Sequence, residues 1–136
     1  MPASPEAALR TARVIAIALI GGCALFAGVV VYLRGERTGT EGMAGVFSLI
    51  GWILAGTQFV LSFVFRGRRP EEPFARATHA FTRTIVAVAL NEGAVFLNLT
   101  FSLVTGSLAP FLYAAAIGFA GLLLHFPTRE RFGVEP

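Results

Sequence analysis

The stretch 14-VIAIALIGGCALFAGVVVYL-33 decides the fold class, because it is a long run of residues without a single charge. An α-helix rises 1.5 Å per residue, so about 20 apolar residues cross the roughly 30 Å hydrocarbon core of a bilayer. We therefore predict that Val14–Leu33 is a transmembrane helix.

Three further apolar stretches follow, and we predict spans over residues 43–65, 81–104 and 110–126. None of them shows the alternation of apolar and polar residues that is typical of a half-buried strand. The uncharged turn between the third and fourth spans is short, which makes those spans antiparallel neighbours. The predicted fold class is an all-α membrane protein, a four-transmembrane-helix bundle made of two antiparallel hairpins.

The remaining residues connect and flank these spans. Residues 1–13 and 127–136 are expected to be terminal tails, and residues 66–80 a charged linker. Within the linker, prolines and acids favour a helix start near Glu71 or Pro73, because acids are stabilised at the positive end of the helix dipole. The third helix should therefore begin in water and enter the membrane near Phe81.

Composition supports the membrane class: 55% of residues are hydrophobic, 14% are charged, and the mean hydropathy is +0.71. The net charge of +3 comes from arginines beside apolar segments, which indicates topology and not a nucleic-acid partner. Nine arginines lie on one side of the predicted membrane and two, Arg34 and Arg37, on the other. The nine are Arg10, Arg13, Arg66, Arg68, Arg69, Arg76, Arg83, Arg129 and Arg131. The positive-inside rule then predicts that both termini and the linker lie in the cytoplasm. We expect the membrane to be a bacterial inner membrane.

The segment Ile20–Cys23, "IGGC", also matches a lipoprotein cleavage site, in which case Cys23 would carry lipid. We favour an uncleaved signal-anchor helix because Ala24–Leu33 continues apolar. A single cysteine excludes an intrachain disulfide, and no His or Cys has metal-ligand spacing. No catalytic set or phosphate loop is present, so we expect neither an enzyme nor a cofactor nor a metal.

Glu92 is the feature that calls for a function. It lies about eleven residues, or about 16 Å, into the third span, close to the bilayer midplane. An acid at that depth costs on the order of 3 kcal/mol, which favours its uncharged form and a position facing protein or water. Such a carboxyl is able to take up and release a proton.

Polar residues at heptad spacing run along the same helix: Thr84, Asn91, Asn98 and Thr105, with Ser102 one turn beyond Asn98. This polar stripe should face other helices, because hydrogen-bonding groups that face lipid would go unpaired. Gln58 of the second span lies at a similar depth and is the expected partner of Glu92. The candidate proton- or cation-binding residues are therefore Glu92, Asn91, Gln58 and Asn98.

The stretch FTRTIVAVALNEGAVFLNLTFSLV, residues 81–104, resembles the acid-bearing helix of the proteolipid c subunit of rotary F-type ATP synthases. The matching residues are Arg83, Ala87–Leu90, Glu92 and Phe96. The resemblance implies that Glu92 is a proton carrier. The first and fourth spans have no counterpart in the two-helix c subunit, and the whole chain resembles small four-span bacterial membrane proteins of no known role.

Two functions remain open at this point. In the first, the protein is a non-enzymatic membrane subunit, a homo-oligomer or a part of a larger membrane complex, whose Glu92 binds a proton or a cation. In the second, it is a structural accessory or assembly protein in which Glu92 only fixes helix packing.

Overall fold

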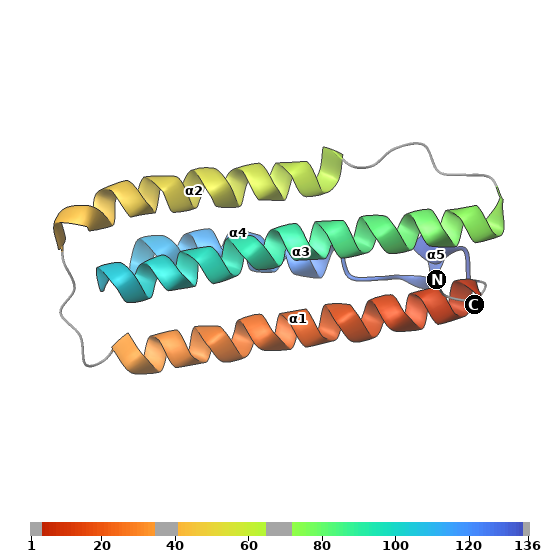
Figure 1. Cartoon of the computed structure of the whole chain (residues 1–136), viewed down its shortest axis with the longest axis horizontal. Coiled ribbons are helices and arrows are strands. Elements are labelled where there is room, and N and C mark those ends of the chain that lie inside the picture. Colours follow the sequence, from red (N-terminus) through yellow and green to blue (C-terminus); the bar gives the residue numbers. More distant parts are fainter. Residues whose placement is uncertain (1–3, 35–40, 65–71, 135–136) are drawn as a thin grey trace.

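The computed structural model describes residues 4–34, 41–64 and 72–134, and within these ranges all regular structure is helical (Figure 1). The helices are α1 (Pro5–Arg34), α2 (Glu41–Val64), α3 (Pro73–Thr105), α4 (Ala109–Leu124) and the short α5 (Arg129–Phe132). The all-α prediction is confirmed. The predicted polar loop at 35–40 and the linker residues 66–71 lie outside the described residues.

Three of the helices are long and apolar enough to cross a membrane: Pro5–Leu33, Met43–Val64 and Phe74–Thr105. The fourth apolar helix, Ala109–Leu124, is shorter, and its 16 residues extend about 24 Å. Both α1 and α3 begin before the predicted spans, since the helical part of α1 starts at Pro5 and that of α3 at Pro73.

Local sequence explains where α3 and α4 begin and end. Glu72 has extended backbone angles immediately before Pro73, and proline fits the first turn of a helix because its missing N–H has no acceptor there. Gly106 ends α3 with φ of 69°, a left-handed conformation that glycine adopts without strain, and its N–H donates to Ser102 O. Pro110 then opens α4. The tight turn predicted between these helices is confirmed.

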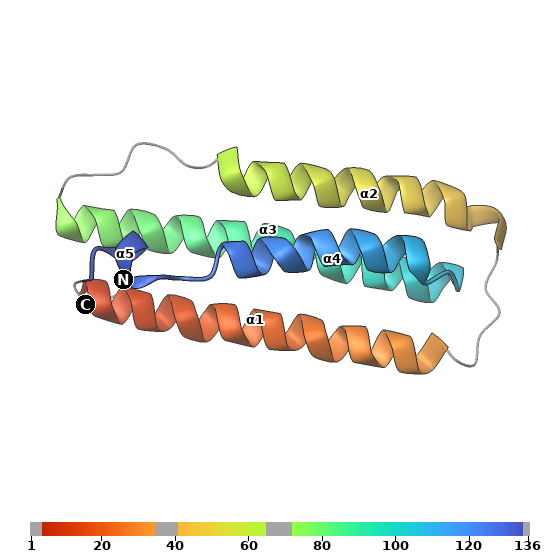
Figure 2. The same cartoon turned by 180° about the vertical axis from the view of Figure 1, so that it is seen from behind.

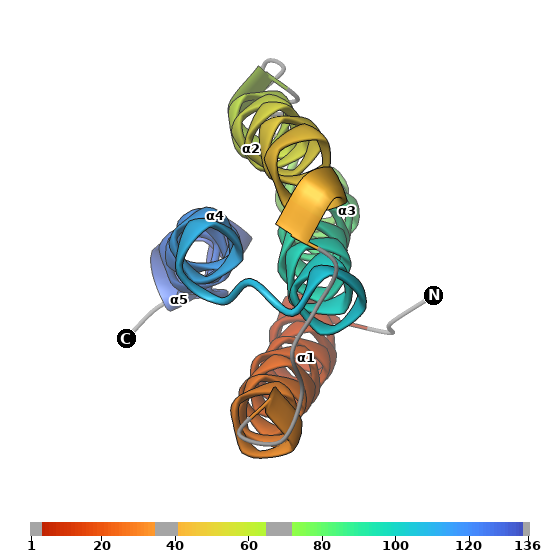
Figure 3. The ribbon, with the colours of Figure 1, turned by 90° about the vertical axis from the view of Figure 1, so that its left-hand side faces the viewer.

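Helix order in space differs from helix order in sequence. Seen end-on, α2, α3 and α1 form a row with α3 in the middle, and α4 packs against one side of α3 (Figure 3). Over the described residues α1 and α2 make no contact with each other. The prediction of two packed hairpins is therefore half wrong: α3 and α4 pair as expected, whereas α1 and α2 run antiparallel on opposite flanks of α3.

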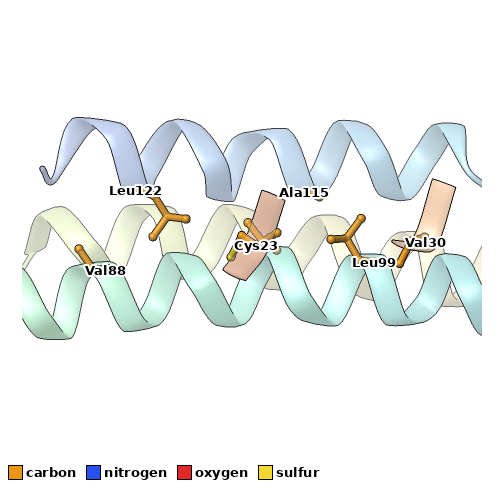
Figure 4. Packing of buried hydrophobic residues seen from close by; sticks show 7 residues of the cluster. Cys23, Val30, Val88, Leu99, Ala115 and Leu122 are labelled. Atoms are coloured by element: carbon orange, nitrogen blue, oxygen red, sulfur yellow. The ribbon is translucent and has the colours of Figure 1, made fainter. Parts of the chain in front are cut away.

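Apolar packing holds α1 and α4 to the central helix. Cys23 and Val30 of α1 meet Val88 and Leu99 of α3, and Leu122 of α4 closes the same cluster (Figure 4). The rings of Phe26 and Phe96 stack with centroids 4.8 Å apart, which fixes the register of α1 on α3. On the other side of α3, three buried alanines bring α2, α3 and α4 close together: Ala55, Ala94 and Ala114.

The first halves of α1 and α3 extend beyond the ends of α2 and α4 (Figures 1 and 2). Gly121, close to the end of α4, lies against Asn91 of α3. Leu124 ends α4 about one turn later, so about fifteen residues of α3 project beyond α4, or about 22 Å at 1.5 Å each. We call this part of the molecule the projecting end.

The C-terminal segment covers the projecting end. After α4 the chain continues to α5, whose Phe132 is fully buried among residues of α1 and α3. The buried members of this cluster are Ala8, Leu9, Ala12, Ala77 and Phe132. Residues 127–134 are thus not a free tail but a packed part of the fold.

Apart from Glu92, all charged side chains that the structure describes belong to the projecting end or to the segment that covers it. They are Glu6, Arg10, Arg13, Glu72, Arg76, Arg83, Arg129, Glu130 and Arg131. The side chains that the structure describes in α2 and α4 carry no charge. Among the described side chains, charge is therefore concentrated at the projecting end, and we call the rest of the helix bundle the apolar body.

Candidate functional site

The polar stripe of α3 is buried, as predicted. Its members have exposed fractions of 6% or less: Thr84, Asn91, Asn98, Ser102 and Thr105. Because α3 lies between α1, α2 and α4, its polar residues meet other helices along most of its length. The prediction that these groups turn towards protein is confirmed.

Asn98 locks α3 to α2. Its Nδ2 donates to Ala94 O in its own helix at 2.9 Å and to Gly51 O in α2 at 3.3 Å. Its Oδ1 occupies the place that a Cβ at residue 51 would take. Only glycine leaves room for the amide at this point, so the Asn98–Gly51 pair fixes the position of α2 along α3.

Asn91 makes the corresponding lock with α4. Its Nδ2 donates to Ala87 O at 2.8 Å, and its Oδ1 lies where a Cβ at Gly121 would stand. One turn earlier in α4, a Cβ at Gly118 would come within 2.8 Å of the backbone oxygen of Asn91. Two glycines therefore let α4 approach the backbone of α3 closely.

The last polar residues of the stripe organise the turn after α3. Ser102 Oγ donates to Ser107 O at 3.0 Å, and Thr105 Oγ1 accepts from the N–H of Ser107 at 3.3 Å. Both hydroxyls satisfy backbone groups that the end of the helix would leave unpaired. Their role is structural.

The sequence suggests that Gln58 of α2 pairs with Glu92, but no hydrogen bond joins the two side chains in the described residues. Its side-chain amide lies beside Gly93, within 3.9 Å of where a Cβ of that residue would be. The Oε1 of Gln58 is buried and accepts no hydrogen bond from the described residues. The same holds for the Oδ1 atoms of Asn91 and Asn98. Gln58 belongs to the α2 flank of α3.

Glu92 belongs to the α1 flank. It is partly exposed, and it lies one turn before Phe96, whose ring stacks on Phe26 of α1. It forms no hydrogen bond and no salt bridge with any residue of the described ranges. The four candidate residues thus separate into two structural asparagines, a glutamine on one flank and an unpartnered carboxyl on the other.

The surroundings of His125 differ from those that its position in the sequence suggests. A histidine near the end of the fourth span should be solvated, but only 5% of His125 is exposed. Its Nε2 is 3.0 Å from Ser62 Oγ of α2, and its ring lies 4.7 Å from that of Phe63. The pair joins the ends of α2 and α4. Pro127 signals a helix end near His125, but nothing in one sequence indicates its Ser62 partner.

Within the described ranges no three residues among His, Cys, Asp and Glu gather as metal ligands would. Cys23 is fully buried in the apolar cluster between α1, α3 and α4. Among the side chains that the structure describes in the apolar body, Glu92 carries the only carboxyl. No family model, curated protein or solved structure matches the chain.

Proposed function

We propose that the protein is a non-enzymatic integral membrane subunit of the bacterial inner membrane whose Glu92 carboxyl binds a proton or a cation at a contact with a partner helix. The projecting end lies in the cytoplasm in this proposal, because its described part carries six arginines. The partner is a second copy of this chain or a helix of a larger membrane complex.

The observation that carries the proposal is the state of Glu92: partly exposed, without a hydrogen-bond partner in the described residues, and in the apolar part of α3. Glu92 lies nine residues after Arg83 and thirteen before Thr105, the end of α3, which is about 14 Å and 20 Å from them, so a 30 Å layer between these two residues would hold Glu92 in its interior. A bare carboxylate facing lipid there is unfavourable by on the order of 3 kcal/mol. Protonation, cation binding or a covering partner removes that cost.

The open side of α3 supplies a place for such a partner. Opposite α4, the exposed residues of the helix fall at helical spacing: Thr82, Val86, Ala89, Thr100 and Val104. The side chains of this row are small, and the hydroxyls of Thr82 and Thr100 donate to backbone oxygens of their own helix. Small residues let a second helix approach closely in a membrane. Glu92 lies beside this row on the α1 side.

The resemblance of residues 81–104 to the acid helix of rotary ATP synthase c subunits supports the same chemistry, with Glu92 as the proton carrier. In such an arrangement the carboxyl works at a surface between subunits, which agrees with a group that is partly exposed and has no intramolecular partner.

Labelling with a hydrophobic carbodiimide tests the proposal, because the reagent attacks a protonated carboxyl. The full chain in liposomes should gain one adduct at Glu92, and the extent of labelling should fall as the pH is raised from 5 to 9. Intact-mass and peptide mass spectrometry measure the site and the extent. If a cation is the ligand, added Na⁺ should protect Glu92 at constant pH.

Two variants make the result specific. Glu92→Gln should abolish the adduct while keeping the helical content, whereas Glu72→Gln, which changes an exposed acid at the projecting end, should leave it unchanged. Absence of an adduct at every pH, or labelling that ignores pH, would contradict proton binding at Glu92.

The close contacts of Asn98 with Gly51 and of Asn91 with Gly121 favour the second candidate function, a structural accessory or assembly protein. The side chains of Asn91 and Asn98 pack against α4 and α2. If Glu92 has a similar packing role, Glu92→Leu should weaken the assembly, Glu92→Gln should preserve it, and both variants should leave any proton-linked property of the membrane unchanged. Under the favoured function, Glu92→Leu and Glu92→Gln both lose the proton-linked property.

A further inference from the structure

A groove with a volume of about 400 Å³ lies between the first turns of α1 and the C-terminal segment that carries α5. Figure 2 shows these two parts side by side beyond the end of α4. The residues that line the groove come from both: Glu6, Leu9, Arg10, Arg13, Val14, Ile17, Arg129 and Val134. The lining combines arginines with apolar side chains, and on α1 the apolar Val14 and Ile17 follow Arg10 and Arg13 along the helix.

Three arginines and one glutamate give the groove a formal charge of +2. Arg10 and Arg129 are exposed and approach it from different helices. The Nε–H of Arg13 donates to Pro127 O at 3.3 Å, which holds this guanidinium at the seam between α1 and the C-terminal segment. Guanidinium groups that converge from two elements suit a phosphate, since each presents several N–H donors in a planar fork.

The apolar wall continues directly into the body of the molecule. Val14 and Ile17 are 62% and 60% exposed, and they start the long uncharged run of α1. They lie on the same face of the helix as Arg10 and Arg13, because residues three and four apart share a face. The groove thus spans the level at which lipid headgroups give way to acyl chains.

We propose that this groove binds an anionic phospholipid, with its phosphate held by Arg10, Arg13 and Arg129 and an acyl chain lying over Val14 and Ile17. Charge complementarity and the adjoining apolar wall point to a lipid and not to a soluble anion. The site is separate from Glu92, and the proposal does not depend on proton binding there.

Native mass spectrometry of the full chain in detergent tests the proposal. Phosphatidylglycerol and phosphatidylcholine with identical acyl chains are titrated separately, and phosphatidylglycerol should bind at least fivefold more tightly. One basic residue near an anionic lipid contributes about 1 kcal/mol, which is about fivefold in affinity. The double variant Arg10→Gln/Arg129→Gln should therefore weaken phosphatidylglycerol binding by about twentyfold.

Arg131→Gln is the matched control for the single variant Arg129→Gln, which should weaken binding about fivefold, because both remove one charge from α5 but Arg131 does not line the groove and donates instead to Leu124 O. It should change the affinity less than twofold. Glu6→Gln should strengthen binding severalfold by removing the acid from the groove, a gain that a poorly folded variant would not produce.

Three outcomes would overturn the proposal. Equal binding of the two lipids would show that the charge of the headgroup is irrelevant. Equal losses in Arg131→Gln and in Arg129→Gln, each of which removes one charge from α5, would show that only overall charge matters. Displacement of phosphatidylglycerol by millimolar inorganic phosphate or glycerol 3-phosphate would show a soluble phosphate site, in which the apolar wall has no part.

Discussion

At the scale of single residues, the two asparagines of α3 act through the glycines that face them. An amide in a membrane interior needs a partner helix, and Gly51 and Gly121 provide the room for it. Each lock also includes a hydrogen bond from the amide to its own helix, which reduces the number of unpaired groups. The function of the stripe is to set helix positions, and the chemistry is left to Glu92.

Substitution of Gly121 tests this account. Gly121→Ala places a methyl group where the Asn91 amide stands and should destabilise the protein by about 1–3 kcal/mol, the usual effect of overpacking. Unfolding in mixed detergent micelles measures the change. Gly56→Ala in α2 is the control, because nothing lies within 4 Å of its added Cβ. Equal stabilities of the two variants would contradict the lock.

The sequence reveals that the stripe is buried, since polar groups at heptad spacing cannot face lipid at low cost. It does not reveal which helix each residue meets. Gln58 and Glu92 share a depth, but the direction of a side chain depends on how each helix is rotated and on which flank of α3 it packs. For the same reason the contact of His125 with Ser62 becomes visible only in the folded chain.

At the scale of elements, α5 is the part that sequence patterns describe least well. Four residues of helix, Arg129–Phe132, are too short to show periodicity, and the polar residues around them suggest a tail. The apolar Phe132 and Val134 are the only local signal. Their burial follows from the unequal lengths of α3 and α4, because the short α4 leaves the projecting end uncovered on one side.

Removing the ring of Phe132 should release the C-terminal segment without unfolding the apolar body. Phe132 is fully buried, so removing its ring should weaken the packing of the C-terminal segment by about 3–5 kcal/mol. The other contacts of α5 are too few to hold the segment in place. In Phe132→Ala, trypsin should cleave after Arg129 and Arg131 at least tenfold faster. Phe74→Ala, at a side chain 46% exposed, serves as the control. Unchanged cleavage of Phe132→Ala would show that other contacts hold the segment.

At the scale of the whole molecule, charge and length divide the protein into two parts. The four apolar helices and the concentration of arginines near the projecting end are readable from hydropathy and from counting charges, whereas the start of α1 and the presence of α5 are not. The order of the helices across the bundle cannot be read from the sequence. Helices that follow each other in sequence usually pack together, and side-chain fit decides that α1 and α2 do not. Here the stacked rings of Phe26 and Phe96 hold α1 to one flank of α3, and small residues let α2 pack closely on the other flank.

Cysteine labelling in whole cells tests the proposed orientation. A membrane-impermeant maleimide should react with Ala109→Cys, at the exposed start of α4, in intact cells. It should react with Thr128→Cys, beside α5, only after the membrane is permeabilised. Unmodified protein is the control, since Cys23 is fully buried and should stay unlabelled. The opposite pattern would place the projecting end outside the cell.

The central position of α3 has a consequence for synthesis. Because α1 and α2 touch α3 but not each other, a nascent chain that has delivered only its first two segments to the bilayer holds two helices with no mate. The bundle can assemble only after α3 has entered the bilayer and packed between α1 and α2. A ribosome stalled before residue 105 would leave an intermediate open to capture by membrane chaperones and proteases.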